Sequence, residues 1–447
     1  MEVVMKTIST SNVFKIAAII SYIIGYIYLK FVLCQDLFGV YGQSVWMLIF
    51  AVLFILWTES FAYLLGNTYQ KLKENGKSVV EPVIFMICVL LQSIAACVYG
   101  LHRDWDIYQL LIWHGTIIYY VMCRMGILAA GRSGIFFLTD CFTGAVMVPI
   151  SNFLLRARKL FHKEGKPEDE EKDFFAPDAE EEKPKNKDLG IIAVSVVVAI
   201  IVCAIAISQL VGVSKTFAGI SEGFVDFWVN IFSIDSIAEF FEETFPIILL
   251  SIPFGCWLYA LVAGSLTKEE VVSAKELEEE TESFHTLPSY SAYIIIGSVC
   301  ALYGIFFISA FIDLLNGNIA TTAHEASEYA VGSFWQLVRV VVLNMAIMGA
   351  SCFVSKEALW TQKKTRILAT ILFVFALAFA LLAAFQLGVY IVGYGFTPRR
   401  ILSSWVVVNI VVWCVLILVR LYKQISAAQI GILFAAATFS IVVLGNF

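Results

Sequence analysis

The sequence predicts an all-α protein, a polytopic transmembrane helical bundle with about eleven spans and one interrupted or re-entrant helix. Of its 447 residues, 60% are hydrophobic and 15% are charged, against roughly 25% charged residues in a soluble domain. The apolar residues also come in blocks of about 20, the length that a helix needs to cross a bilayer. We therefore expect the lipid bilayer as a partner. The formal net charge of −6 gives no reason to expect nucleic acid.

The predicted spans fall on both sides of a charged stretch near the middle of the chain. The first apolar run is longer than a signal-peptide core and lacks a small-residue cleavage site, so we predict that it is a retained span. The predicted spans are residues 13–33, 44–66, 83–101, 108–128, 189–212, 246–266, 293–315, 333–354, 367–392, 401–421 and 429–447.

Residues 134–155 are apolar but interrupted by Asp140, Gly144, Pro149 and Asn152. If the N-terminus and the charged stretch that follows lie on the same side, four spans precede this segment. It must then enter and leave the membrane on one side. We predict a re-entrant or interfacial helix.

The distribution of lysine and arginine predicts the orientation. Of the 30 Lys and Arg residues, 24 fall in cytoplasmic segments and span ends when the N-terminus is cytoplasmic, and 5 fall outside. Arg339 lies within a span. This asymmetry follows the positive-inside rule, so we predict a cytoplasmic N-terminus.

The charged stretch divides the chain. We predict an N-terminal membrane half at residues 1–155, a charged cytoplasmic linker at 156–188 and a C-terminal membrane half at 189–447. High charge with few apolar residues favours a solvated tether for the linker. Residues 213–245 combine aromatic and acidic side chains, which suits the outer membrane interface, and the acidic loop 268–282 is predicted to be cytoplasmic.

Motifs of the soluble enzyme classes are missing. The chain has no Walker loop, dinucleotide fingerprint, Gly-x-Ser-x-Gly elbow, or kinase or protease signature. Its 10 cysteines lie singly, with no Cys-x-x-Cys pair. We predict no catalytic residue, cofactor or metal site, and whether the protein is an enzyme stays uncertain.

Four polar residues fall where hydrocarbon makes them costly: Glu59, His114, Arg124 and Asp140. A carboxylate and a histidine in one bundle are typical of a proton relay. Pairing within one helix, or an Arg124 side chain that extends to the interface, explains the same residues without a function.

A polar stripe precedes and enters the span 333–354. Thr322 and Glu325 have the spacing of a capping box, which predicts a helix start. From there polar residues recur at three- and four-residue steps and share one face. His324 adds no zinc motif, because His-Glu-x-x-Glu lacks a second histidine. The candidate binding residues of the stripe are Glu325, Glu328, Trp335, Gln336 and Arg339.

The loop 393–400 is the second marked element. Gly and Pro predict a compact turn, and Arg399 and Arg400 depart from the charge rule by lying outside. Contact with the acids near Glu328, binding of a lipid phosphate or ligand carboxylate, and anchoring at headgroups all remain open. With Tyr390 and Tyr394, these arginines complete a hypothetical outward-facing binding site.

The same residues resemble a known family. Glu328-Tyr329-Ala330, Phe334-Trp335-Gln336-Leu337 and Tyr394-Gly395-Phe396-Thr397-x-x-Arg400 resemble a family of uncharacterised bacterial multi-pass membrane proteins, known only as a domain of unknown function. The resemblance covers about 293–447. It implies a protein of the bacterial plasma membrane and brings no substrate or reaction.

We favour transport or binding of a small molecule, ion or lipid. A membrane-embedded enzyme, and a sensor or assembly partner in the bacterial envelope, are the alternatives. Outer-face acids with perturbed pKa values would favour an enzyme, and broken helices at mid-membrane would favour transport. The protein partners stay unknown.

Overall fold

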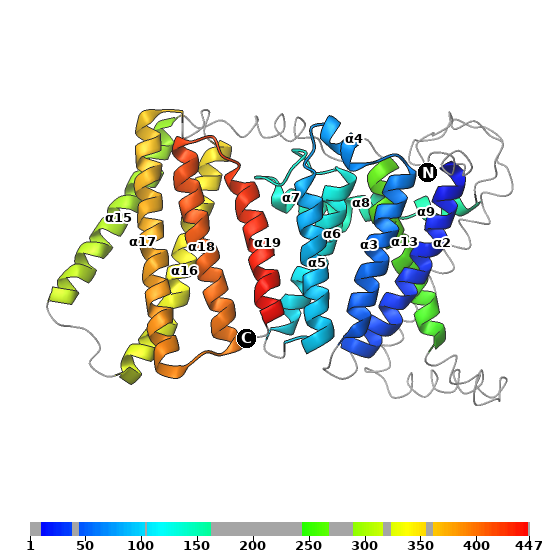
Figure 1. The fold of residues 1–447 in the computed structure, drawn as a ribbon. Coiled ribbons are helices and arrows are strands. Elements are labelled where there is room, and N and C mark those ends of the chain that lie inside the picture. The colour runs from blue at the N-terminus through cyan, green and yellow to red at the C-terminus, as the bar shows by residue number, and fades with distance from the viewer. Residues whose placement is uncertain are drawn as a thin grey trace, which may run out of the picture.

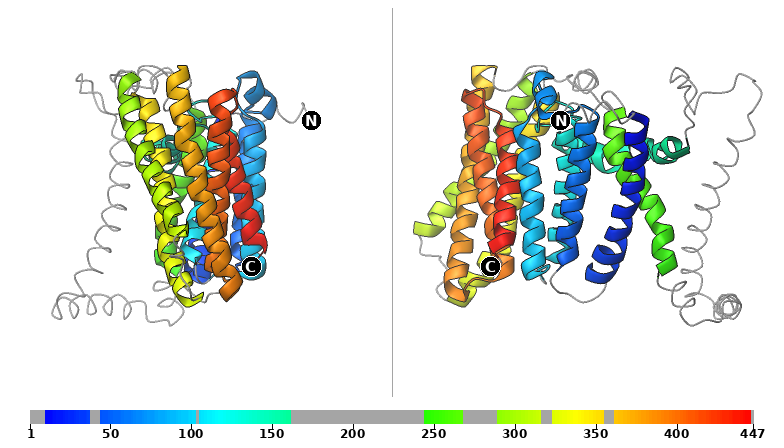
Figure 2. Two further views of the ribbon diagram at one scale, coloured as in Figure 1. Left: turned by 90° about the vertical axis from the view of Figure 1, so that its left-hand side faces the viewer. Right: turned by 45° about the vertical axis from the view of Figure 1, so that its right-hand side comes forward.

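The computed structural model describes residues 10–37, 44–102, 105–161, 244–267, 289–315, 323–354 and 361–445. Every element in these ranges is a helix, and the long helices run roughly along one direction (Figures 1 and 2). The all-α bundle predicted from composition is confirmed. The elements are α2 (Thr10–Ile27), η1 (Tyr28–Leu37), α3 (Val45–Leu64), α4 (Tyr69–Glu74), α5 (Val80–Tyr99), α6 (Asp106–Met125), α7 (Phe137–Phe142), η2 (Thr143–Met147), α8 (Val148–Ser151), α9 (Leu155–Phe161), α13 (Phe245–Thr267), α15 (Ser289–Leu315), α16 (Ala323–Val354), α17 (Lys363–Tyr394), α18 (Pro398–Tyr422) and α19 (Ala427–Gly445).

Eight helices among the described residues are long and apolar enough to cross a membrane. The protein is therefore an integral membrane protein. The predicted spans 108–128 and 293–315 correspond to α6 and α15, which do not belong to these eight. α6 is 20 residues long but carries Gln109, His114 and Arg124, which lower its apolar character. The predicted span 189–212 lies outside the described residues, as do 213–243 and 268–282.

The interrupted segment is a chain of short helices. α7 and α8 flank the π-helix η2, and Pro149 stands at the start of α8. Proline fits the first helical turn, where its missing N–H is not needed. α7, α8 and α9 all lie towards the end of the bundle at which α6 ends (Figure 1). The segment thus returns to the side from which it came, as a re-entrant or interfacial helix would.

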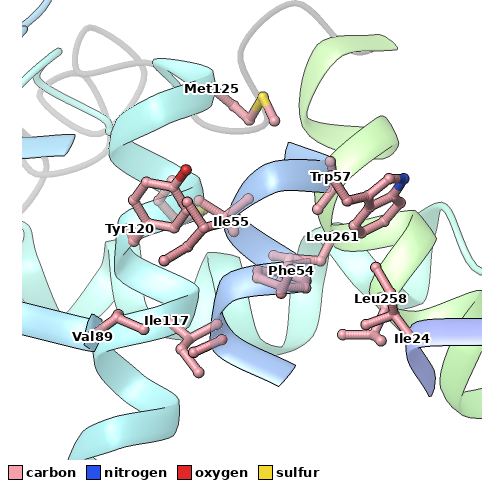
Figure 3. Packing of buried hydrophobic residues seen from close by; sticks show 14 of the residues in the cluster. Ile24, Phe54, Ile55, Trp57, Val89, Ile117, Tyr120, Met125, Leu258 and Leu261 are labelled. Carbon is pink, nitrogen blue, oxygen red and sulfur yellow. The ribbon is translucent and has the colours of Figure 1, made fainter. Parts of the chain in front are cut away.

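The first group of helices packs α2, α3, α5, α6 and α13 around one hydrophobic core. Figure 3 shows side chains of all five helices meeting there, among them Phe54, Ile117 and Leu258. α2 and α13 come especially close. A Cβ built on Gly25 would lie 3.3 Å from the Gly255 Cα, so glycine at these positions allows the two backbones to touch.

A second group, α15 to α18, surrounds a separate core that includes Phe373 and Phe379. α19 lies between the groups and packs against both α5 and α18. Trp105 and Phe439 pack together at this junction. α13 and α19 follow the linker in the sequence, yet both pack on helices that precede it. The packing groups therefore do not coincide with the two halves predicted on either side of residues 156–188. That division stays a prediction about segments of the chain.

The described cations gather at one end of the bundle, which we call the basic end. It is the end at which α2, α5, α17 and α19 begin and α3, α6 and α18 end (Figure 1). Lys30, Arg399 and Arg400 lie towards the opposite end. The basic end carries Lys15, Lys71, Lys73, Lys77, Arg124, Arg132, Arg156, Arg158, Lys159, Lys363, Lys364, Arg366, Arg420 and Lys423.

The charge asymmetry makes the orientation testable. An epitope inserted after Gly76, in the exposed turn that follows α4, should bind antibody only in permeabilised cells, since the positive-inside rule places the basic end in the cytoplasm. An epitope after Phe396, which is 73% exposed at the opposite end, should bind in intact cells. Labelling after Gly76 in intact cells would contradict the predicted topology.

Candidate functional site: buried carboxylates and a polar seam

Glu59 and Arg124 form an ion pair that joins α3 to α6. Arg124 Nε donates to Glu59 Oε2 at 2.7 Å, and the side chain of Arg124 is 2% exposed while that of Glu59 is 26% exposed. Tyr69 and Tyr120 donate their hydroxyls to the other carboxylate oxygen at 2.9 and 2.8 Å. Both carboxylate oxygens therefore have partners.

The remaining face of the Arg124 guanidinium is also occupied. Its NH1 group donates to the Asn67 carbonyl at 2.9 Å, and its plane lies 4.5 Å from the centre of the Tyr69 ring. Burial and the negative charge of Glu59 raise the pKa of Tyr69 above its ordinary range, so the phenol remains a donor. The Glu59 oxygens and the Arg124 Nε and NH1 groups thus have their partners within this cluster. The ion pair therefore holds α3, α4 and α6 together at the basic end.

His114 belongs to a different cluster in the core of the first group. Its Nδ1 lies 2.8 Å from the Leu110 carbonyl, which can only accept. Nδ1 must therefore carry a proton, and Nε2 of the neutral ring accepts from the Tyr28 hydroxyl at 2.6 Å. Tyr28 also stacks on Phe254. The structure thus separates His114 from Glu59 and Arg124, and no hydrogen bond among the described residues links them.

Asp140 is a buried carboxyl group with one unused oxygen. It lies on α7 and is 2% exposed. Oδ1 accepts from the Ala129 N–H at 2.9 Å, whereas the buried Oδ2 has no hydrogen-bond partner. Burial raises the pKa of Asp140 to about 6, the charge of Glu81 adds to this effect, and the Ala129 bond opposes it.

Glu81, in the first turn of α5, is completely buried. Its two oxygens share the Ser133 N–H at 3.0 and 3.1 Å, and Gln429 on α19 donates to Oε1 at 2.7 Å. In the described part of the chain, neither Glu81 nor Asp140 forms an ion pair. Two carboxyl groups without an ion-pair partner therefore lie near each other at the basic end.

Further polar side chains lie at the contact between α5, α6 and α19, eleven residues beyond Glu81 on α5, and we call the two levels together the polar seam. Gln92 Nε2 donates to Ser440 on α19 at 3.1 Å and to Thr116 on α6 at 3.4 Å. Its buried Oε1 has no partner. Ser93 follows Gln92 on α5, and its Oγ accepts from Trp113 Nε1 at 2.8 Å. The polar seam consists of Glu81, Gln92, Ser93, Thr116, Gln429 and Ser440.

The spacing of these contacts shows that α5 and α19 run parallel and in register. Glu81 binds Gln429, and Gln92 binds Ser440. Both pairs are separated by 348 residues in the sequence. The two contacts are eleven residues apart on each helix, or roughly 16 Å at 1.5 Å per residue. The polar seam therefore extends from the basic end well into the apolar thickness.

The residues of the predicted outward-facing stripe lie elsewhere. Trp335 is 47% exposed, and Gln336 and Arg339 share that exposed face of α16. The opposite face, with Phe334 and Val341, packs in the second core. The side chains of Glu325 and Glu328 lie outside the described residues, so their part of the proposed site stays a prediction.

Arg400 is held by the turn in which it lies. Its NH1 group donates to the carbonyls of Tyr394 and Gly395, and its guanidinium lies 4.3 Å from the centre of the Tyr390 ring. Gly395 has a φ of +75°, which favours glycine at the end of α17. The structure therefore brings Tyr390, Tyr394 and Arg400 together. Among the described side chains, no hydrogen bond or ion pair joins Arg339 to them.

Glu81, Gln92 and Gln429 were not predicted from the sequence as site residues. The predicted span began at residue 83, so Glu81 was assigned to the preceding loop. The steps from Glu81 to Phe85, Cys88 and Gln92 are four, three and four residues. This helical spacing was the signal that they share one face.

The comparisons with known proteins extend the resemblance found in the C-terminal part. A family described as a domain of unknown function, DUF4153, matches residues 37–447. The similarity thus reaches far beyond the 293–447 region that carried it in the sequence. No curated protein and no solved structure matches the chain.

The Glu59–Arg124 ion pair should make a large contribution to stability. Glu59→Gln leaves the buried Arg124 charge uncompensated, and breaking a buried pair from one side costs on the order of 3 kcal/mol. We expect a clear fall in Tm in detergent. Glu74→Gln, on the exposed surface of α4, is the matched control and should change stability by less than about 0.5 kcal/mol. Equal falls in Tm for both variants would contradict a stabilising buried ion pair.

Asp140 should make the stability depend on pH. Its pKa is raised from 3.8 to about 6, so the protein binds the proton more tightly when folded than when unfolded. This contribution is fully present below pH 4 and is lost as the pH rises to about 6. Thermal unfolding between pH 4 and pH 8 should show this loss in the wild type and not in Asp140→Asn, which keeps the acceptor for Ala129. Identical pH profiles would contradict it.

Proposed function

The chain belongs to the family of the domain of unknown function DUF4153, and because that description gives no activity, we propose from its side chains that the protein carries a small solute or ion across the membrane along the polar seam. The observation that supports this most is the depth of the seam. Its polar groups lie at two levels: Glu81 is buried at the basic end, and Gln92, Ser93, Thr116 and Ser440 are buried roughly 16 Å deeper. Buried polar groups within a membrane are costly and commonly mark a substrate or ion pathway.

The position of the polar seam supports the same proposal. α19 packs against α5 of the first group and α18 of the second, so the seam lies beside the junction of two helix groups with separate cores. Alternating access in many transporters is a rigid-body movement of one helix group against another around a fixed site. A shift at this junction would break or remake the contacts of Gln429 and Ser440.

The irregular segment beside the seam adds further support. Ser133 N–H binds Glu81, and Asp140 begins the run of short helices that includes the π-helix η2. Irregular backbone at membrane depth is tolerated where it is buried in protein or lines a water-filled cavity. Such broken helices form the ion and substrate sites of many transporters.

The chemistry of the seam favours a cation or a neutral polar solute. Its described side chains offer one carboxylate, two amides and three hydroxyls, from Glu81, Gln92, Ser93, Thr116, Gln429 and Ser440. None of these residues is cationic. An anion would meet Glu81 without a compensating charge, so repulsion opposes its entry.

The location is part of the proposal. The excess of cations at the basic end supports a cytoplasmic N-terminus through the positive-inside rule, and the resemblance noted in the sequence supports the plasma membrane of a bacterium. A solute on the seam would then leave or enter the cytoplasm beside Glu81.

The proposal predicts solute-dependent currents or uptake. The full chain, reconstituted in proteoliposomes, should give a transient current on a solid-supported membrane when sodium is added, or take up a radiolabelled neutral amino acid, sugar or nucleoside. Gln92→Leu should strongly reduce this current or uptake, because the variant removes the amide that joins α5, α6 and α19.

Asn344→Leu is the matched control. Asn344 is also a fully buried amide and accepts from Tyr303 at 2.6 Å, but it lies in the second core, away from the seam. This variant should keep the current or uptake of the wild type. Current and uptake that do not differ from those of protein-free liposomes for any of these solutes would contradict the proposal, as would equal losses in both variants.

A further inference from the structure

Asp140 and Glu81 hold the loop between α6 and α7 at the basic end. Asp140 Oδ1 binds the N–H of Ala129, and Glu81 binds that of Ser133. The Tyr119 hydroxyl also donates to Ser133 Oγ at 3.1 Å. Two buried carboxyl groups on different helices thus fix two backbone positions of one loop.

The loop is tied to the α4–α5 connection as well. Ser78 N–H donates to the Gly131 carbonyl at 3.0 Å, and Lys77 Nζ donates to the Gly126 carbonyl. Gly126 ends α6 with a φ of +75°. A Cβ built there would lie 2.7 Å from Leu72, so only glycine fits. These contacts fix the backbone around the two carboxyl groups.

The surroundings of Asp140 suit a proton better than a metal ion. The titratable groups whose charges influence this region are Glu81 on α5, Tyr119 and Cys123 on α6, and Cys141 on α7. Lys77 uses its ammonium on the Gly126 carbonyl. In the ranges that the structure describes, no three His, Cys, Asp or Glu residues come together as a metal site. A proton needs only one oxygen, and Oδ2 of Asp140 has no other partner.

The two carboxyl groups differ in how well their anions are stabilised. Glu81 accepts from two donors, Ser133 and Gln429, and lies in the first turn of α5, where the helix dipole favours negative charge. Asp140 also lies in the first turn of a helix, but α7 is only six residues long and Asp140 accepts from Ala129 alone. A single proton shared by the pair therefore goes to Asp140.

We propose that Asp140 and Glu81 form a proton-binding site at the basic end of the polar seam, in which Asp140 takes up the proton on Oδ2 while Glu81 stays bound to Ser133 and Gln429. The inference rests on the proposed function only where it names the proton as the ion that the seam uses. Proton binding itself is independent of transport. Uptake removes a negative charge beside Glu81, so the occupancy of Asp140 would affect the contact between α5 and α19.

Infrared difference spectroscopy of the full chain in lipid nanodiscs tests the site directly. Between pH 8 and pH 4 the wild type should gain the C=O band of a buried carboxylic acid, with a midpoint near the pKa of about 6 expected for Asp140. Carbon-13 labelling of aspartate should shift this band, and labelling of glutamate should not. Because labelling needs no mutation, the test stands even where a variant fails to fold.

Variants test whether the band comes from Asp140. Asp140→Asn should lack it, and Asp106→Asn, at the opposite end of α6, should retain it. Glu81→Gln should retain it with a midpoint at lower pH, since one negative charge is gone. A band that shifts with labelled glutamate, or that persists in Asp140→Asn, would overturn the proposal.

A sodium ion is the competing occupant. If sodium chloride raises the Tm of the wild type at pH 8 more than choline chloride does, and this difference disappears in Asp140→Asn, the site binds a cation and the proton assignment is wrong. The two proposals fail separately. A titrating Asp140 without solute-dependent current or uptake would overturn transport alone, whereas current or uptake without the band would overturn the proton site alone.

Discussion

The structure depends on one constraint: inside hydrocarbon, a polar group without a partner in the protein is costly. The backbone meets it by forming helices. Arg124 meets it with Glu59 and the Asn67 carbonyl, and His114 with Tyr28 and its own helix. In each case the polar side chain also connects two helices. The contact that offsets the cost of burying the side chain therefore also orders the bundle.

Close backbone packing complements these polar contacts, because lipid gives little hydrophobic drive for helices to associate. Gly25 and Gly255 bring α2 and α13 together although more than 200 residues separate them. Gly264 does the same for α13 and α8, where an added Cβ would lie 2.8 Å from Asn152. α13 thus belongs to the first group, and it packs against α8 of the irregular segment.

The sequence predicted the fold well and the site only in part. Apolar blocks of about 20 residues define helices directly, and Pro149 with Asp140 marked the interrupted segment. Glu59 and Arg124 stood out as polar residues within spans, but nothing in a single sequence indicates that they pair. Glu81 was missed because it precedes Pro82 at a predicted span edge. Its partner Gln429 lies 348 residues away, a pairing that depends on the register of α5 and α19.

The contrast between the two carboxyl groups gives the basic end its chemical character. Glu81 has two donors, whereas Asp140 has one donor and an oxygen without a partner. Neighbouring titratable groups whose environments differ in this way commonly divide into a lasting anion and an exchangeable acid. Because Glu81 contacts α19 and Asp140 lies on the irregular segment that includes α7 and η2, a proton at this point would act on the junction of the two helix groups. This makes the basic end of the seam the place where binding and helix movement would be coupled.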